Sequence, residues 1–127
     1  MAWRVLAVIC GSTIGLVGCG EDEVLCAPLP AWAVAVDVRD SVTDASLVDG
    51  ARGAVHSDVH TDSLRPEPIY LFPDPVLVGG ESEGIVEVRV ERAGYVPWIA
   101  AGVRTRLVGS PCQSWDTQAL TAHLQPE

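Results

Sequence analysis

An alternating pattern runs through Gly84-Ile85-Val86-Glu87-Val88-Arg89-Val90-Glu91. Three valines occupy every second position, and charged residues follow each of them. Successive side chains of a β-strand point to opposite faces, whereas a helix of about 3.6 residues per turn would mix the two groups. The stretch therefore predicts a strand with one buried face and one solvated face.

The same alternation recurs near the start of the chain. Trp32, Val34, Val36 and Val38 are expected on one side of a strand, and Ala33, Ala35, Asp37 and Arg39 on the other. Further strands are expected at Ala51–Ser57, Ile69–Phe72, Val76–Val78, Trp98–Leu107 and Asp116–Leu124. The segment Asp58–Pro68 carries the least pattern and is predicted to be a mobile loop. About seven short strands separated by Gly, Pro and Asp turns predict an all-β fold, a single immunoglobulin- or transthyretin-like β-sandwich.

The N-terminal residues indicate an export signal. Arg4 precedes an uncharged run, Val5 to Gly20, that is shorter than the roughly 20 apolar residues a membrane-spanning helix needs. Near the end of the run, Leu16-Val17-Gly18-Cys19 resembles a lipobox, the motif at which a bacterial lipoprotein signal peptide is removed after its cysteine is lipidated. We therefore expect a lipoprotein signal peptide at residues 1–18, a tether at 19–25 and one domain at 26–127.

Acylated Cys19 would make the lipid bilayer the first partner of the chain. Palmitate or a similar acyl chain is expected there. Gly20 stands where some bacteria place an aspartate as an inner-membrane retention signal, so the expected location is the outer membrane or cell surface. An envelope protein or a glycan is the expected second partner, and the protein is expected to be a monomer.

The charge of the mature part excludes one class of function. After residue 18 the chain has seven Arg, no Lys and 17 Asp or Glu, which gives 7 − 17 = −10. Such a field repels nucleic acid, so nucleic-acid binding is set aside. An acidic excess first favours solubility of an exported domain, and a second interpretation is recognition of a cationic partner.

Two of the four cysteines remain for a disulfide. Cys10 lies in the signal region and Cys19 is assigned to lipid, which leaves Cys26 and Cys112 in an oxidising compartment. The alternative of a two-thiol metal site requires further ligands.

A longer pattern resembles a known family. It runs Val34-x-Val36-x-Val38-x-Asp40-x-x-Thr43-x-x-x-Leu47-x-x-Gly50-Ala51, and later Gly84-x-Val86-x-Val88-x-Val90-x-x-x-Gly94-Tyr95. Together these resemble the carboxypeptidase regulatory-like domain, a transthyretin-like β-sandwich found beside peptidases and in exported bacterial lipoproteins. The usual Thr-Gly of the first hairpin is Thr43-Asp44 here. The resemblance implies a non-enzymatic binding or structural module, with no cofactor.

Several polar groups suggest other functions. One face of a strand would carry His56, Asp58, His60 and Asp62. This face is the alternative site for a metal or small ligand. The spacing of about 6.6 to 6.8 Å between successive side chains on one face of a strand favours a solvated, metal-free face instead. Asp37, Asp40, Asp44 and Asp49 suggest calcium but do not match a contiguous calcium loop. The letters G-x-S-x-G at Gly80–Gly84, with Asp116 and His123 downstream, lack the strand-to-helix context of a hydrolase. A ureide-ring hydrolase of transthyretin type would end in Tyr-Arg-Gly-Ser, and this chain does not, so no catalytic residue is assigned.

Overall fold

The computed structural model describes Cys26, residues 32–70 and residues 72–127. These residues form nine strands in the order β1 (Val34–Asp40), β2 (Arg52–His56), β3 (Thr61–Glu67), β4 (Val76–Gly79), β5 (Gly84–Glu91), β6 (Trp98–Thr105), β7 (Leu107–Val108), β8 (Ser114–Trp115) and β9 (Gln118–Leu124). The described part of the chain contains no helix, and so none that is long and apolar enough to cross a membrane. The predicted all-β class is confirmed.

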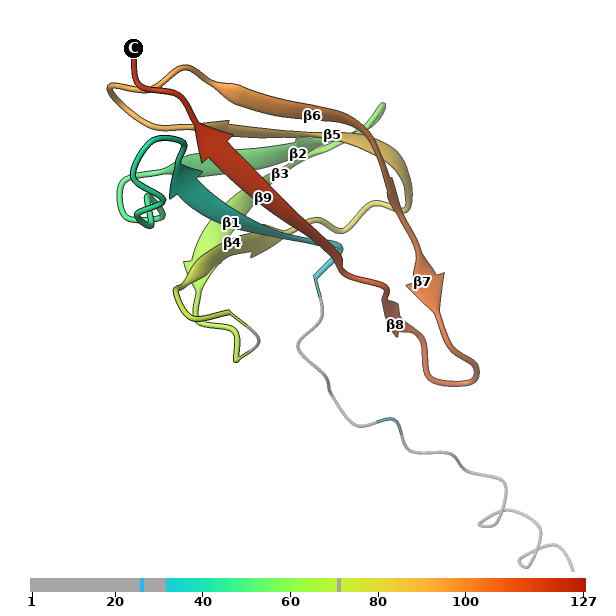
Figure 1. The fold of residues 1–127 in the computed structure, drawn as a ribbon. Coiled ribbons are helices and arrows are strands. Elements are labelled where there is room, and N and C mark those ends of the chain that lie inside the picture. The colour runs from blue at the N-terminus through green and yellow to red at the C-terminus, as the bar shows by residue number, and fades with distance from the viewer. Residues whose placement is uncertain (1–25, 27–31, 71) are drawn as a thin grey trace, which may run out of the picture.

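Seven strands form one sheet in the order β6-β5-β2-β3-β4-β1-β9, and β7 pairs with β8 in a small separate sheet. The large sheet curls so that β2, β5 and β6 form one layer and β1, β4 and β9 the other (Figure 1). Neighbours are antiparallel except β1 and β9, which are parallel. The two edges meet at one end, where Tyr95 and Pro126 form a bridge and the Val96 amide donates to the Gln125 carbonyl at 2.8 Å.

Strand β3 connects the two layers. Its first half pairs with β2, from Thr61 to Leu64, and its second half pairs with β4, from Arg65 to Glu67. Beyond Leu64 the side of β3 that had faced β2 has no strand partner. Pro66 lies there, as expected for a residue that is confined to unpaired strand edges.

The core lies between the layers and follows the predicted alternation. Val86, Val88 and Val90 of β5 are buried there. They contact the cluster that also contains Val34, Val36, Val38, Leu77, Ala122 and Leu124. Close packing of this kind favours glycine at position 53, because a Cβ there would lie 2.7 Å from the end of the Leu64 side chain and 3.3 Å from the Arg89 carbonyl, so neighbours would have to shift.

The outer face of β1 and β4 is buried as well. Ala35, Val76 and Val78 form a second cluster, covered by Trp32, Ile69 and Phe72. Strand β4 is therefore buried along its whole length. The expectation that Trp32 shares a face with Val34 is wrong, because Trp32 precedes β1 and packs on the opposite side of the layer.

Two segment predictions are also wrong. Asp58–Pro68, expected as a loop, contains the whole of β3. Of the stretch Ile69–Phe72, expected as a strand, the described residues Ile69, Tyr70 and Phe72 lie in the loop after β3. Only Leu64 of β3 is buried, so the strand has no hydrophobic alternation to detect. Ile69 and Phe72 are apolar because they cover the second cluster.

Candidate functional site

The disulfide predicted from the cysteine positions is present. Cys26 and Cys112 are bonded, with their Cα atoms 5.5 Å apart and 86 positions apart in sequence. Cys112 lies in the connection between β7 and β8, and Cys26 precedes β1. The bond therefore links the start of the domain to the hairpin that leads into β9. Cys19, the predicted lipidation residue, lies outside the described residues.

The four residues of the alternative metal site do not form one strand face. His56 ends β2, Asp58 and His60 lie in the turn, and Asp62 belongs to β3, where it pairs with Val55. His56 contacts the Thr61 hydroxyl through Nδ1 at 3.1 Å, whereas His60 Nε2 lies 2.7 Å from Asp62 Oδ1. The prediction of a shared face is wrong because Ser57 turns the chain, its amide donating to the His60 carbonyl. Among the described residues, no group of three or more His, Cys, Asp or Glu is placed to hold a metal ion.

Asp40, one of the calcium candidates, instead organises the loop after β1. Its Oδ1 accepts hydrogen bonds from the Val42 and Thr43 amides at 2.7 and 3.0 Å, and its Oδ2 accepts one from the Tyr95 hydroxyl at 2.7 Å. Asp44 in the same loop takes a φ of 62°, a conformation that glycine adopts without strain and that aspartate tolerates. The bond from Tyr95 fixes this loop to the β5–β6 turn.

Acid is expected to destabilise the domain through Asp40. The hydrogen bond from Tyr95, followed by those from the Thr43 and Val42 amides, holds the pKa of Asp40 below its ordinary value of 3.8. A carboxylate with a lowered pKa in the folded state contributes stability above its unfolded-state pKa, and this contribution is lost as the pH falls below about 4. Tyr95→Phe should lower the midpoint of thermal unfolding by roughly 5 °C at neutral pH.

The difference between Tyr95→Phe and the unchanged protein should shrink when the pH is lowered from neutral into the acid range, because protonation removes the charge of Asp40. Tyr70→Phe is the matched control because Tyr70 is 94% exposed, and it should leave the midpoint unchanged at neutral and at acid pH. An equal deficit for Tyr95→Phe at neutral and at acid pH would show that the bond does not depend on the charge of Asp40.

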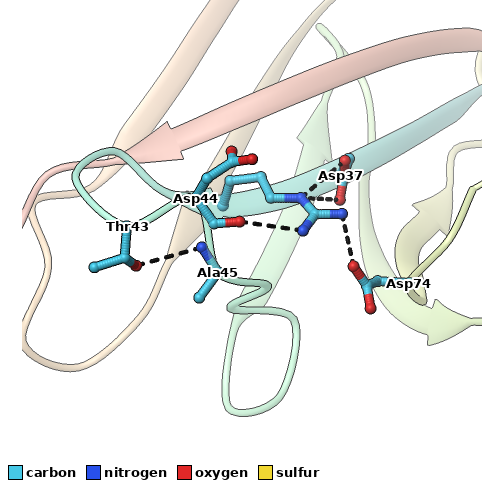
Figure 2. Close-up of polar contacts among 6 residues, drawn as sticks. Asp37, Thr43, Asp44, Ala45 and Asp74 are labelled. Atoms are coloured by element: carbon cyan, nitrogen blue, oxygen red, sulfur yellow. Dashed lines mark hydrogen bonds and ion pairs between the residues drawn. The ribbon is translucent and has the colours of Figure 1, made fainter.

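Arg39 joins three segments of the chain (Figure 2). Its Nε lies 3.1 and 3.2 Å from the two carboxylate oxygens of Asp37, one terminal nitrogen donates to Asp74 at 2.8 Å, and the other donates to the Asp44 carbonyl at 3.3 Å. The hydrogen bonds to Asp37 and then Asp74 raise the pKa of Arg39 above its ordinary value. Asp37, a second calcium candidate, is therefore used to hold Arg39. The contacts connect β1 to the loop before β2 and to the loop before β4.

A groove lies beside these two loops. It is lined by Ser46 and Val48–Ala51 on one side and by Pro66 and Pro75 on the other, with a volume of about 480 Å³. The groove exists because β3 leaves β2 after Leu64, and the loop before β2 only partly fills the space beside Pro66. Most of the residues that line the groove are apolar, among them Val48, Ala51 and the two prolines. Ligand sites are usually lined in this way. We call it the proline groove.

The proline groove carries negative charge. Asp49 lines it, and the side-chain carboxylates of Asp49 and Asp44 make no hydrogen bond or ion pair with any other described residue. Two of the cations that flank the groove have carboxylate partners, and a third, Arg92, donates to the Asp49 backbone carbonyl without an ion-pair partner in the described part of the chain. Arg39 binds Asp37 and Asp74, and Arg65 lies 3.2 Å from Glu67.

A second hollow, of about 350 Å³, lies on the outer face of β2 and β5. It is lined by Ala54 and by Arg52, His56, Arg89 and Glu91. Glu91 lies 3.3 Å from Arg89, which leaves Arg52 without an ion-pair partner in the described part of the chain. This hollow has mixed charge, in contrast to the proline groove.

The residues of the G-x-S-x-G motif occupy the loop between β4 and β5 and the first position of β5, so the strand-to-helix turn of a hydrolase is not formed at this place. Asp116 pairs with Arg106 at 3.0 Å, and His123 is exposed on β9. Asp116 is therefore engaged by Arg106 and His123 faces solvent, and neither is paired with Ser82 in the described part of the chain.

Neither the proline groove nor the role of Arg39 was predicted from the sequence. Pro66 falls in the segment that the sequence predicts to be a loop, and the acids of the first loop are predicted only as calcium candidates. The signal that could have located the groove is Pro66 itself, because a proline inside a strand marks an edge without a partner.

A scan against protein-family models finds no match to this chain, and neither does a search of curated proteins. The fold and the disulfide define the class at a coarser level: an all-β domain with a curled seven-stranded sheet and one long-range covalent link.

Proposed function

We propose that the chain is an exported lipoprotein whose β-sandwich acts as a non-enzymatic binding or structural module of the cell envelope. The observation that carries the proposal is the stretch Leu16-Val17-Gly18-Cys19, which follows an uncharged run and precedes acidic residues. Acylation of Cys19 would hold the domain at a membrane, since more than one acyl chain gives stable attachment. The resemblance to the carboxypeptidase regulatory-like domain is part of the same proposal.

The Cys26–Cys112 bond supports export, because disulfides persist in oxidising compartments and are rare in the cytosol. The net charge of the mature part supports a role on a solvated surface and disfavours contact with anionic lipid or nucleic acid. The proposed location is the outer membrane or cell surface, and the proposed state is a monomer.

Cys19→Ala is expected to abolish membrane attachment. The variant has no thiol to lipidate at the cleavage position, so the protein should be released or remain unprocessed. Cell fractionation with mass measurement of the purified protein gives the answer. Cys10→Ala is the matched control, because Cys10 lies in the part to be removed, and it should fractionate as the unchanged protein does. A Cys19→Ala protein that stays with membranes at the mature mass of the unchanged protein would contradict the proposal.

A further inference from the structure

We propose that the proline groove binds a basic segment of a partner protein, an extended stretch in which Lys or Arg alternates with aliphatic residues. The inference names a ligand class for the binding module and rests on that proposed function. Three observations carry it: the shape of the groove, its apolar lining, and the charge at its side.

The shape of the groove is held by covalent and polar constraints. Pro66 and Pro75 have fixed φ angles, and Gly50 takes a φ of 84° in the turn where the Ala51 amide donates to the Val48 carbonyl. Arg39 connects the two sides, since it donates both to the Asp44 carbonyl and to Asp74, the residue before Pro75. A site that is formed before the ligand arrives loses little conformational entropy on binding.

The lining and the volume fit a short stretch of chain. Val48, Ala51 and the two prolines provide apolar surface, and a groove of about 480 Å³ accommodates a few side chains. Pro66 lies on the side of β3 that β2 has left, so an extended segment can pack against its ring by side-chain contact, without pairing as an added strand, because Pro66 has no amide hydrogen.

The negative charge beside the groove favours a cationic ligand. The carboxylate of Asp49 lines the groove without a partner among the described residues, and Arg39 and Arg65 are already paired. Arg92 contacts the same turn, where it donates to the Asp49 carbonyl at 2.9 Å and lies over the Tyr95 ring, so its charge offsets part of the charge of Asp49. The net charge of −10 for the mature part attracts basic partners over a longer range.

The test is a titration of the full-length chain, isolated in detergent, with two fluorescent peptides. One is acetyl-Leu-Lys-Leu-Lys-amide and the other is acetyl-Leu-Glu-Leu-Glu-amide, each labelled at the same position. We expect the basic peptide to bind and the acidic peptide to bind at least roughly tenfold more weakly. Raising the salt from about 0.05 to 0.5 M should weaken binding of the basic peptide, because exposed charges are screened.

Two variants locate the site. Asp49→Asn should weaken binding about two- to fivefold, which is the range for one exposed charge pair. Ser46→Phe should abolish binding by filling the groove from an exposed position. Asp58→Asn is the matched control, since it removes the same charge from an exposed turn that does not line the groove, and it should have no effect. Unchanged thermal unfolding of each variant shows that it is folded.

Each other result overturns the inference. Binding that Ser46→Phe and Asp49→Asn leave intact would place the site elsewhere, and tighter binding of the acidic peptide would favour the hollow beside Arg52. No binding of the basic peptide at about 1 mM would show that the groove does not take this ligand. None of these results bears on membrane attachment, which Cys19→Ala tests separately.

Discussion

Cys112→Ser is expected to lower the midpoint of thermal unfolding by more than about 10 °C. The disulfide closes a loop across 86 positions, and the chain-entropy model gives about 4 to 5 kcal/mol for a loop of that length. Removal of a native disulfide from a small exported domain costs about 2 to 5 kcal/mol in practice. That loss is a large share of the stability of one domain of this size.

A small set of variants isolates the bond from the side chains. Cys26→Ser, Cys112→Ser and the double variant should unfold at nearly the same temperature, because each removes the same covalent link. Reduction of the unchanged protein should produce the same shift. Peptide mapping without reduction provides the direct test, and recovery of both cysteines as free thiols from envelope-derived protein would contradict the prediction.

Leu77→Ala should destabilise the domain by about 2 to 5 kcal/mol. Leu77 is fully buried in the core between the layers, on a strand that lies between β3 and β1. The substitution removes apolar contacts and leaves a cavity that the two neighbouring strands cannot easily close. Denaturant unfolding monitored by tryptophan fluorescence measures the loss.

The loss of stability should depend on how deeply the truncated side chain is buried. Ile99→Ala removes a side chain of similar size from β6, but Ile99 is 49% exposed, so the loss should be below about 1 kcal/mol. Val78→Ala probes the second cluster on the other face of β4 and should cost about 1 to 3 kcal/mol. A loss for Leu77→Ala no larger than that for Ile99→Ala would contradict the assigned core.

Alternation predicted the strands that have one buried face. The stretch Gly84–Glu91 is β5 with the expected bounds, and Val76–Val78 and Trp98–Leu107 correspond closely to β4 and to β6 with β7. The pairing of Cys26 with Cys112 followed from the compartment and from the elimination of the other two cysteines, and it is confirmed.

The segments that alternation missed are those whose environment depends on distant parts of the chain. Strand β3 buries only Leu64, so nothing in its own sequence distinguishes it from a loop. Trp32 is apolar because it covers the outer face of β4, a contact that cannot be inferred before the strand order is known. The proline groove arises where β3 changes partner, and this too is a property of the topology.

The parallel pairing of β1 with β9 has a consequence for biogenesis. Val34 lies opposite Gln118 and Asp40 opposite Leu124, so the first strand of the domain obtains one of its two neighbours from the last. Contacts between residues so far apart in sequence give a high contact order, and folding of such topologies is slow. The domain therefore cannot complete its sheet while its C-terminal strand is still being synthesised, and under the proposed export the sheet would also stay incomplete until β9 has left the translocation pore.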